Sequence, residues 1–146
     1  MIVELTREFL DQILALENLC FSEPWTHDAY AAEFMHVYSH TWGWVEEENL
    51  VGYLTGWLVF EEFHIANLAV HPDHRRKGIA QTLLDFTLCW AARNEGRVSL
   101  LEVRASNEAA IELYRRNGFK SVMTRRNYYS NPVEDALILR KELGVE

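Results

Sequence analysis

The stretch of sequence that decides the fold is residues 67–84, NLAVHPDHRRKGIAQTLL. It passes from a short apolar segment through a basic loop into an amphipathic helix, which we expect to begin after Gly78 and to end near Gly96. The apolar positions of that helix recur at steps of three and four, at Ile79, Leu83, Phe86 and Trp90. The stretch therefore predicts a strand, a turn and a helix in immediate succession.

Gly78 stands at the turn where this helix begins. A glycine there lets the backbone approach a ligand closely, and the next few amides have no acceptor inside the helix. Such free N–H groups and the positive end of the helix dipole together bind phosphate, and Arg75, Arg76 and Lys77 add positive charge beside them. The run fits neither a Walker loop nor the three-glycine dinucleotide fingerprint. It indicates a phosphate ligand, with a solvated basic loop as the alternative.

The segments on either side alternate between strand-like and helix-like patterns. We expect strands over 2–5, 38–46, 50–60, 63–70, 98–103, 119–126 and 136–140, and helices over 7–20, 26–35, 79–96 and 108–117. The order strand, two helices, three strands, helix, strand, helix and two strands predicts a mixed α/β sheet covered by helices on both faces. Because no linker or repeat interrupts this order, residues 1–146 are expected to form a single domain.

Bulk composition narrows the class of protein. The chain has 146 residues, 49% of them hydrophobic and 25% charged, which is typical of a folded globular domain. No apolar stretch reaches the roughly 20 residues of a membrane helix, and the N-terminus lacks a signal-peptide pattern, so we expect a cytoplasmic protein without a membrane partner. The net charge of −8 argues against nucleic acid and suits a cationic partner, with the solubility that an acidic surface gives to any protein as the alternative explanation. Cys20 and Cys89 are expected to be buried free thiols.

Three polar residues beyond the helix carry candidate chemistry. Glu102 continues the apolar row of Val98 and Leu100 on one strand face. Partial burial there would raise its pKa and make it a better base, whereas a strand-end glutamate that reaches water is the alternative. Tyr114 lies on an apolar helix face, either as a core residue or as an acid for a leaving group. Asn107 is explained as the N-cap of that helix, which is compatible with a ligand contact.

The motif Arg75-x-x-Gly78-x-Ala80, preceded by residues 67–72, resembles the central motif of the GCN5-related N-acetyltransferases, the GNAT family. The predicted element order is similar to that fold along nearly the whole chain. The resemblance implies acetyl-CoA as cosubstrate, with its pyrophosphate on the amides of the turn and its pantetheine arm against the preceding strand. Ala80 stands where many members have a second glycine, and it keeps the amide. By position these roles fall to Leu68, Ala69 and Val70 in the strand and to Arg76, Lys77, Gly78, Ile79, Ala80 and Gln81 in the turn.

A narrower resemblance also spans most of the chain. The segments involved are FSEPW at 21–25, LEVRASN at 101–107, AAIELY at 109–114, NGF at 117–119, RRNYY at 125–129 and EDA at 134–136. They look like the RimI branch of the family, which acetylates the N-terminal alanine of a small-subunit ribosomal protein. This similarity implies that Glu102 is the base, Tyr114 the acid and Asn107 a cofactor contact.

The mechanism implied by the resemblance is direct transfer of the acetyl group. An α-ammonium has a pKa near 8 and must lose its proton before it can attack. Glu102 would remove that proton, directly or through a water, a backbone amide of residues 68–70 would polarise the carbonyl, and Tyr114 would protonate the departing sulfur. The expected partner is the basic N-terminus of a ribosomal protein. A set of acidic residues would attract it, with ordinary surface charge as the alternative for most of them: Glu23, Glu33, Glu46, Glu47, Glu48, Glu61 and Glu62.

Two other functions use the same residues. A small-molecule N-acetyltransferase acting on a polyamine or an amino-sugar antibiotic would share the cofactor site and differ in its acceptor cleft. A non-catalytic acetyl-CoA sensor would keep the fold, although the presence of both Glu102 and Tyr114 argues against it.

Metal chemistry and thiol chemistry are not expected. The spacings of His64, His71 and His74 fit neither a structural zinc pair nor a helical zinc motif. Cys89 has no neighbouring histidine or acid in the sequence to activate it as a nucleophile. We therefore expect no metal site, and we place His71 and His74 in the loop before the phosphate turn.

Overall fold

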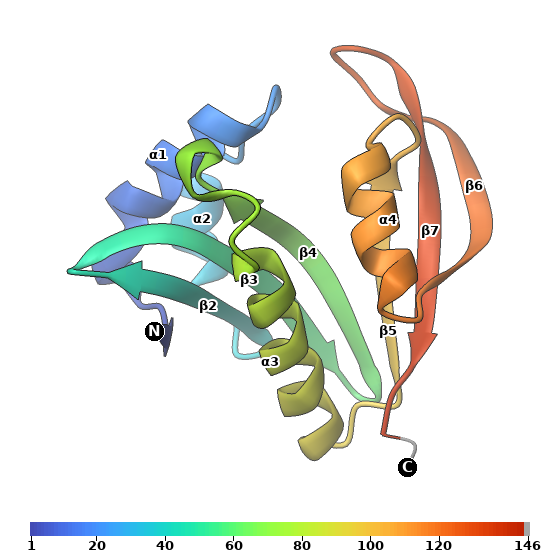
Figure 1. Cartoon of the computed structure of the whole chain (residues 1–146), viewed down its shortest axis with the longest axis horizontal. Helices are drawn as coiled ribbons and strands as arrows, with labels where there is room; N and C mark the ends of the chain where they lie inside the picture. Colours follow the sequence, from blue (N-terminus) through green and yellow to red (C-terminus); the bar gives the residue numbers. More distant parts are fainter. Residues whose placement is uncertain (145–146) are drawn as a thin grey trace.

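The computed structural model describes residues 1–144 and contains a seven-stranded sheet with helices against both of its faces (Figure 1). The strand order is β1-β2-β3-β4-β5-β7-β6, and every neighbouring pair is antiparallel except β4 and β5. The mixed α/β sheet expected from the sequence is confirmed. The elements in chain order are β1 (Ile2–Glu4), η1 (Arg7–Phe9), α1 (Leu10–Cys20), α2 (His27–Glu33), β2 (Ser39–Glu46), β3 (Asn49–Val59), β4 (Glu62–Val70), η2 (Pro72–His74), α3 (Ile79–Arg93), β5 (Val98–Arg104), α4 (Glu108–Arg116), β6 (Lys120–Tyr129) and β7 (Glu134–Glu142).

The first helix and the last hairpin differ in form from the predicted ones, and the helices predicted over 26–35 and 79–96 end earlier, at Glu33 and Arg93. The first helix begins as a single 3-10 turn, capped by the side chain of Thr6, and becomes α-helical at Leu10; such turns are common at helix ends. The last hairpin is longer than predicted, because the ladder resumes between Tyr129 and Glu134 after a bulge in β6. The bulge holds Asn127 at a positive φ of 54° and breaks the alternation by which a strand is recognised in sequence.

Each face of the sheet has its own apolar core. Helices α3 and α4 pack on one face, and α1 and α2 pack on the other (Figure 1). The strand β3 serves both cores, because successive side chains of a strand point to opposite faces: Tyr53 belongs to the core under α1, and Leu54 to the core under α3. The alternation of apolar residues in the strands and their spacing of three to four in the helices therefore mark the side chains that fill these two cores.

β4 and β5 lie side by side only at one end. Their parallel register runs from Glu62–Val98 to Ile65–Leu101 and stops there, and Figure 1 shows the two strands diverging beyond this point. On its other edge β4 stays paired with β3 as far as Val70. Residues 66–70 of β4 therefore face the opening with an edge that has no strand partner within residues 1–144, as a ligand-binding slot requires.

β6 is an exposed edge of the sheet. Every residue of this strand except Tyr129 is exposed, and the strand pairs with β7 alone. Its register is interrupted twice, between Ser121 and Met123 and between Arg125 and Tyr129.

The cysteines are less buried than the sequence led us to expect. Cys20 is half-buried and Cys89 is exposed. The prediction of two buried thiols is wrong for Cys89, because Leu88 and Ala91 face the sheet and the intervening position 89 turns outward. Within residues 1–144, no helix is long and apolar enough to cross a membrane.

Candidate active site

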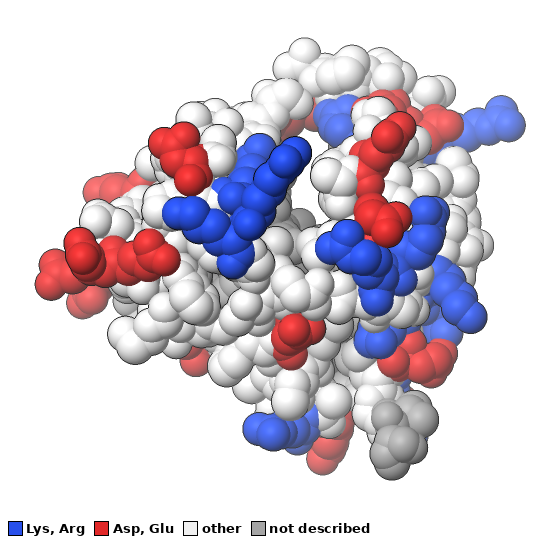
Figure 2. All heavy atoms as spheres, viewed as in Figure 1, with Lys and Arg blue, Asp and Glu red and all other residues white. Residues whose placement is uncertain are grey.

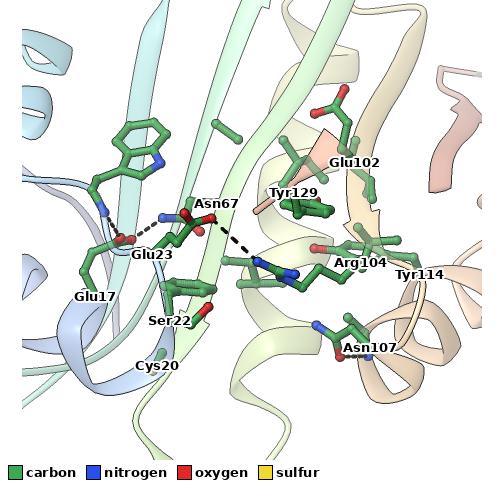
Figure 3. A pocket seen from close by; sticks show the side chains of 18 residues that line it. Glu17, Cys20, Ser22, Glu23, Asn67, Glu102, Arg104, Asn107, Tyr114 and Tyr129 are labelled. Carbon is green, nitrogen blue, oxygen red and sulfur yellow. Dashed lines mark hydrogen bonds and ion pairs between the residues drawn. The ribbon is translucent and has the colours of Figure 1, made fainter. Parts of the chain in front are cut away.

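A pocket of about 530 Å³ occupies the opening between β4 and β5. Figure 3 shows Glu17 and Cys20 of α1 on one side and residues of β5 and α4 on the other. Glu102, Asn107 and Tyr114 all line this pocket, so the fold brings together the three polar residues that the sequence singled out.

The turn before α3 exposes a run of free amides. Arg76 and Gly78 have left-handed φ values of 65° and 79°, and a side chain added at Gly78 would meet nothing within 4 Å. Among the described residues, the amides of 76–81 donate to no protein acceptor, and the first helical bond runs from Thr82 N to Gly78 O at 2.9 Å. Since α3 has 15 residues and begins at these amides, the positive end of its dipole strengthens their attraction for an anion. The turn has the geometry of a phosphate site.

Positive charge flanks the same region from two elements. Figure 2 shows basic side chains on both sides of a hollow between α3 and α4. On the α4 side, Arg115 and Arg116 stand in the last turn of the helix. Arg75 differs from the other basic residues of the turn, because its Nε donates to Val70 O at 3.0 Å and its Nη2 contacts Cys20 Sγ at 3.6 Å. Arg75 therefore links the turn to the end of β4 and to the end of α1.

The strand residues predicted to contact the cofactor lie along the open edge of β4. Leu68, Ala69 and Val70 pair with β3 on one side. On the other side no strand of the described chain pairs with them, although Val70 O already accepts from Arg75 Nε at 3.0 Å. The register with β3 skips Ala66, which marks a bulge at the start of this open segment. A bulge changes the direction of the strand that follows it. Here the change comes just before the open segment, along which an extended ligand would lie.

Glu102 lies where β4 and β5 part, and it is bonded to a histidine. His64 Nε2 stands 2.8 Å from one carboxylate oxygen of Glu102 and 3.1 Å from the other. Burial raises the pKa of Glu102, but the hydrogen bond and charge of His64, helped by Arg125, outweigh burial and leave that pKa below its usual value of 4.5. The upward shift predicted from the sequence is therefore wrong, because the sequence pattern did not reveal the partner on the neighbouring strand.

Tyr114 and Asn107 occupy the α4 side of the pocket. Tyr114 is 6% exposed and packs edge-on against Phe119, with ring centres 5.4 Å apart. Burial, followed by the influence of Tyr129, raises the pKa of Tyr114 well above its usual value, so the phenol keeps its proton at neutral pH. Asn107 caps α4 by accepting from Ala110 N at 3.2 Å, which confirms its predicted structural role.

Arg104 is a pocket residue that the pattern analysis missed. It approaches Glu23 in the α1–α2 loop at 3.7 Å and Glu134 at the start of β7 at 3.1 Å. It also donates to two carbonyls of the β6–β7 loop, each at 3.0 Å, and lies over the ring of Tyr129 at 4.4 Å. Figure 3 shows the ion pair with Glu23 crossing the pocket. Arg104 therefore joins two loops across the opening.

Glu17 is a second residue that was missed. Its carboxylate is fully buried beside the pocket, where Tyr53 and Asn67 donate to it and Trp25 N donates at 2.7 Å. Burial is the largest influence on the pKa of Glu17 and raises it, against these hydrogen bonds. The sequence did carry a signal, since Glu17 follows Ile13 by four positions on the apolar face of α1.

The other two histidines of interest lie in the loop before the turn, as expected. His71 accepts from Asp73 N at 3.0 Å and caps η2, and its ring meets that of His74 at 5.6 Å. In the part of the chain that the structure describes, no three His, Cys, Asp or Glu side chains are grouped as metal ligands.

The acidic residues expected to attract a basic partner are dispersed. Glu23 lines the pocket, whereas Glu33 is buried and accepts from Trp57 Nε1. The other five stand at the β2–β3 and β3–β4 connections, outside the pocket lining: Glu46, Glu47, Glu48, Glu61 and Glu62.

Comparison with known proteins fits this geometry. The model of the Acetyltransferase (GNAT) family matches residues 10–119, which include the turn, both diverging strands and α4. The chain belongs to the GNAT family. It is an N-acetyltransferase, and members of this family draw on acetyl-CoA.

Individual relatives of this GNAT protein are similar over nearly their whole length. The "[Ribosomal protein bS18]-alanine N-acetyltransferase" of Escherichia coli is 31% identical over 126 residues, covering 85% of this chain and 84% of the relative. The "N-alpha-acetyltransferase RimI" of Mycobacterium tuberculosis is 34% identical over 146 residues, covering 96% and 90%. The crystal structure of the Escherichia coli ribosomal-protein-S18-alanine N-acetyltransferase superposes with a TM-score of 0.93 at 28% identity, covering 100% of this chain and 95% of that one.

Proposed function

We propose that this GNAT enzyme acetylates the α-amine of the N-terminal alanine of a small-subunit ribosomal protein. The observation that carries the proposal is the chain-long similarity to N-acetyltransferases that are named for that activity. The pocket supports it, because Glu102 and Tyr114 stand on neighbouring walls of one cavity, where a base and an acid can act on the same acceptor.

The residues of the turn and of β4 fit acetyl-CoA. Six consecutive amides, those of residues 76–81, are free to hold a pyrophosphate. The open edge of β4 at Leu68 and Ala69 has no strand partner among the described residues and can pair with an extended amide-containing arm, whereas the carbonyl of Val70 is already bonded to Arg75. Asn107 lines the pocket and can reach the same ligand with the amide nitrogen that the cap leaves free. When bound, acetyl-CoA supplies the activated acetyl group.

Glu102 and Tyr114 then act on protons. Glu102 is ionised at neutral pH because its pKa is low, so it can bind an α-ammonium and accept its proton, directly or through a water. Tyr114 holds its proton because its pKa is high, so it can donate to a leaving thiolate. A free backbone amide at the edge of β4 can polarise the acyl oxygen.

The pocket mouth has the features of a peptide entrance. The α1–α2 loop and the β6–β7 loop are joined over the pocket through Glu23 and Arg104. The carboxylate of Glu23 lines the pocket and suits a cationic N-terminus. A cytoplasmic ribosomal protein with a basic N-terminal segment is the partner that we propose.

The test is a CoA-release assay with synthetic N-terminal peptides. Alanine-start peptides are compared with serine-, glycine- and methionine-start peptides of the same sequence, and with spermidine and an aminoglycoside. We expect the highest kcat/KM with the alanine-start peptide. Preference for spermidine or the aminoglycoside would replace the proposal with a small-molecule acetyltransferase. Binding of acetyl-CoA without release on any amine would replace it with a sensor.

A further inference from the structure

His64 is a half-buried side chain that the proposed transfer does not use. It comes from β4, and its register partner on β5 is Leu100, two residues before Glu102. Its Nε2 lies within hydrogen-bond distance of both carboxylate oxygens, at 2.8 and 3.1 Å. His64 and Glu102 are 26% and 21% exposed, so the contact is screened from bulk water on most sides. The contact therefore joins the segment of β4 that pairs with β5 to the first residue of β5 beyond that pairing.

Of the two ring nitrogens of His64, Nε2 makes the hydrogen bond to Glu102 and Nδ1 makes none within residues 1–144. Nδ1 is buried and has no hydrogen-bond partner among the described residues. An ionised carboxylate only accepts, so Nε2 must carry the hydrogen that is donated to Glu102. His64 therefore presents one fixed N–H to Glu102.

The imidazole is held by a chain of contacts from the other side. Its ring stacks on Trp57 of β3, with ring centres 5.0 Å apart and planes at 29°. Trp57 in turn donates its indole N–H to the buried carboxylate of Glu33 in α2. The orientation of His64 is thus set by three elements before it meets Glu102, which is the arrangement of a support for a functional group.

We propose that His64 is a positioning residue, which holds the Glu102 carboxylate ionised and aimed at the amine in the acceptor pocket. This inference rests on the proposed function, in which the α-ammonium N–H bond breaks as an O–H bond forms on Glu102 and the electron pair stays on nitrogen. The N–H of His64 occupies one side of the carboxylate and leaves the remaining lone pairs for the acceptor. Because Glu102 keeps its charge, it binds the ammonium as a counter-ion before the proton moves.

The charged and titratable groups around Glu102 determine how its pKa should change when His64 is replaced. His64 from β4 and Arg125 from β6 favour the ionised carboxylate, and burial opposes it. Tyr129 of β6 stays neutral, because its pKa is raised to about 12, first by burial. On β7 the register partner of Glu102 is the apolar Ile138. When His64 is removed, burial is opposed mainly by Arg125, and the pKa of Glu102 should rise.

The experiment compares the unmodified protein with His64→Leu and His64→Gln. Gln can place an N–H near the position of Nε2, whereas Leu keeps the volume and removes the donor. The pKa of the Glu102 carboxyl is measured by NMR titration, and kcat/KM is measured from pH 5 to pH 9 with the best acceptor of the amine panel. His36→Leu is the matched control, because His36 also stacks on an aromatic ring, that of Tyr38, but lies outside the pocket lining.

We expect His64→Leu to raise the carboxyl pKa, to move the acid limb of kcat/KM to higher pH and to lower kcat at least about ten-fold. His64→Gln should keep the carboxyl pKa, the acid limb and kcat close to those of the unmodified protein. His36→Leu should change none of the three. An unchanged titration of Glu102 in folded His64→Leu overturns the proposal, as does an unchanged pH profile. The titration needs no turnover, so it decides the role of His64 even if the alanine-start peptide is not a substrate.

Discussion

Arg104 and Glu23 face one another across the pocket mouth at 3.7 Å, one from the end of β5 and the other from the loop after α1. The pair joins the α1–α2 loop to the end of β5 across the opening that forms where β4 and β5 separate. Both side chains are partly exposed, so the ion pair is worth no more than about 1 kcal/mol. Its main effect is to fix the shape of the entrance rather than to stabilise the fold.

Glu23→Ala should therefore change acceptor binding more than stability. We expect the KM of the alanine-start peptide to rise up to about five-fold, since 1.4 kcal/mol corresponds to ten-fold, while the KM of acetyl-CoA stays constant. Glu47→Ala removes the same charge from the β2–β3 turn, outside the pocket lining, and should have no effect. Equal changes in both variants would mean that only overall charge matters.

Tyr114→Phe tests the proposed acid. Phenylalanine fills nearly the same space against Phe119, so the midpoint of thermal unfolding should stay close to that of the unmodified protein. Loss of a general acid lowers turnover by about a hundred-fold or more, and acetyl-CoA affinity measured by calorimetry should hardly move. Tyr128→Phe, at an exposed position, is the control. Full turnover in Tyr114→Phe would remove this residue from the mechanism.

Gly78→Ala tests the backbone conformation of the turn without changing its side-chain packing. The new methyl group would meet no neighbour, but a φ of 79° costs an alanine about 1–2 kcal/mol. We expect a lower free energy of unfolding and a weaker affinity for acetyl-CoA, because the strain is relieved by moving the amides that would hold phosphate. Gly118→Ala, at φ 94° and outside the pocket lining, should show the stability loss alone.

The buried carboxylate of Glu17 predicts a pH dependence of stability. Its pKa is raised in the folded state, so the folded protein binds this proton more tightly than the unfolded chain does. Its contribution to stability is complete below the usual value of 4.5 and is lost as the pH rises through the folded pKa. The stability of the unmodified protein relative to Glu17→Gln should therefore fall over that range in denaturant titrations. Glu8→Gln, an exposed change, should leave the relative stability flat.

The open edge of β4 predicts where acetyl-CoA protects the backbone. Amides of residues 66–70 and 76–81 should exchange with solvent more slowly in the complex, and ligand at about 100 times its Kd should add about 2.7 kcal/mol to the free energy of unfolding. The fragment 3′,5′-ADP, which lacks the pantetheine arm, should leave the exchange of residues 66–70 unchanged. Protection of that strand by the fragment would contradict the proposed placement.

The sequence predicts this site unevenly, and the reason is physical. Asn107, Gly78 and the periodic face of Tyr114 are local signals, because a cap, a left-handed turn and a helix stripe involve residues a few positions apart. The element order followed from the same local patterns, and the structure confirms it.

Contacts between distant segments were not predicted. His64 and Glu102 meet only because β4 and β5 pair in one particular parallel register. The sequence of either strand alone does not predict that register. The downward shift in the pKa of Glu102 therefore reversed an expectation built on burial. Arg104 was missed for a similar reason, since its partners come from loops on either side of the pocket.

The outer strand β6 has a consequence for how the molecule behaves at high concentration. Its outward edge offers unpaired peptide groups to any passing strand, which is the usual start of edge-to-edge aggregation. Two register breaks and the charged residues Lys120, Arg125 and Arg126 make this edge a poor template. The bulge that places Tyr129 at the pocket thus also helps to keep neighbouring copies of the enzyme apart.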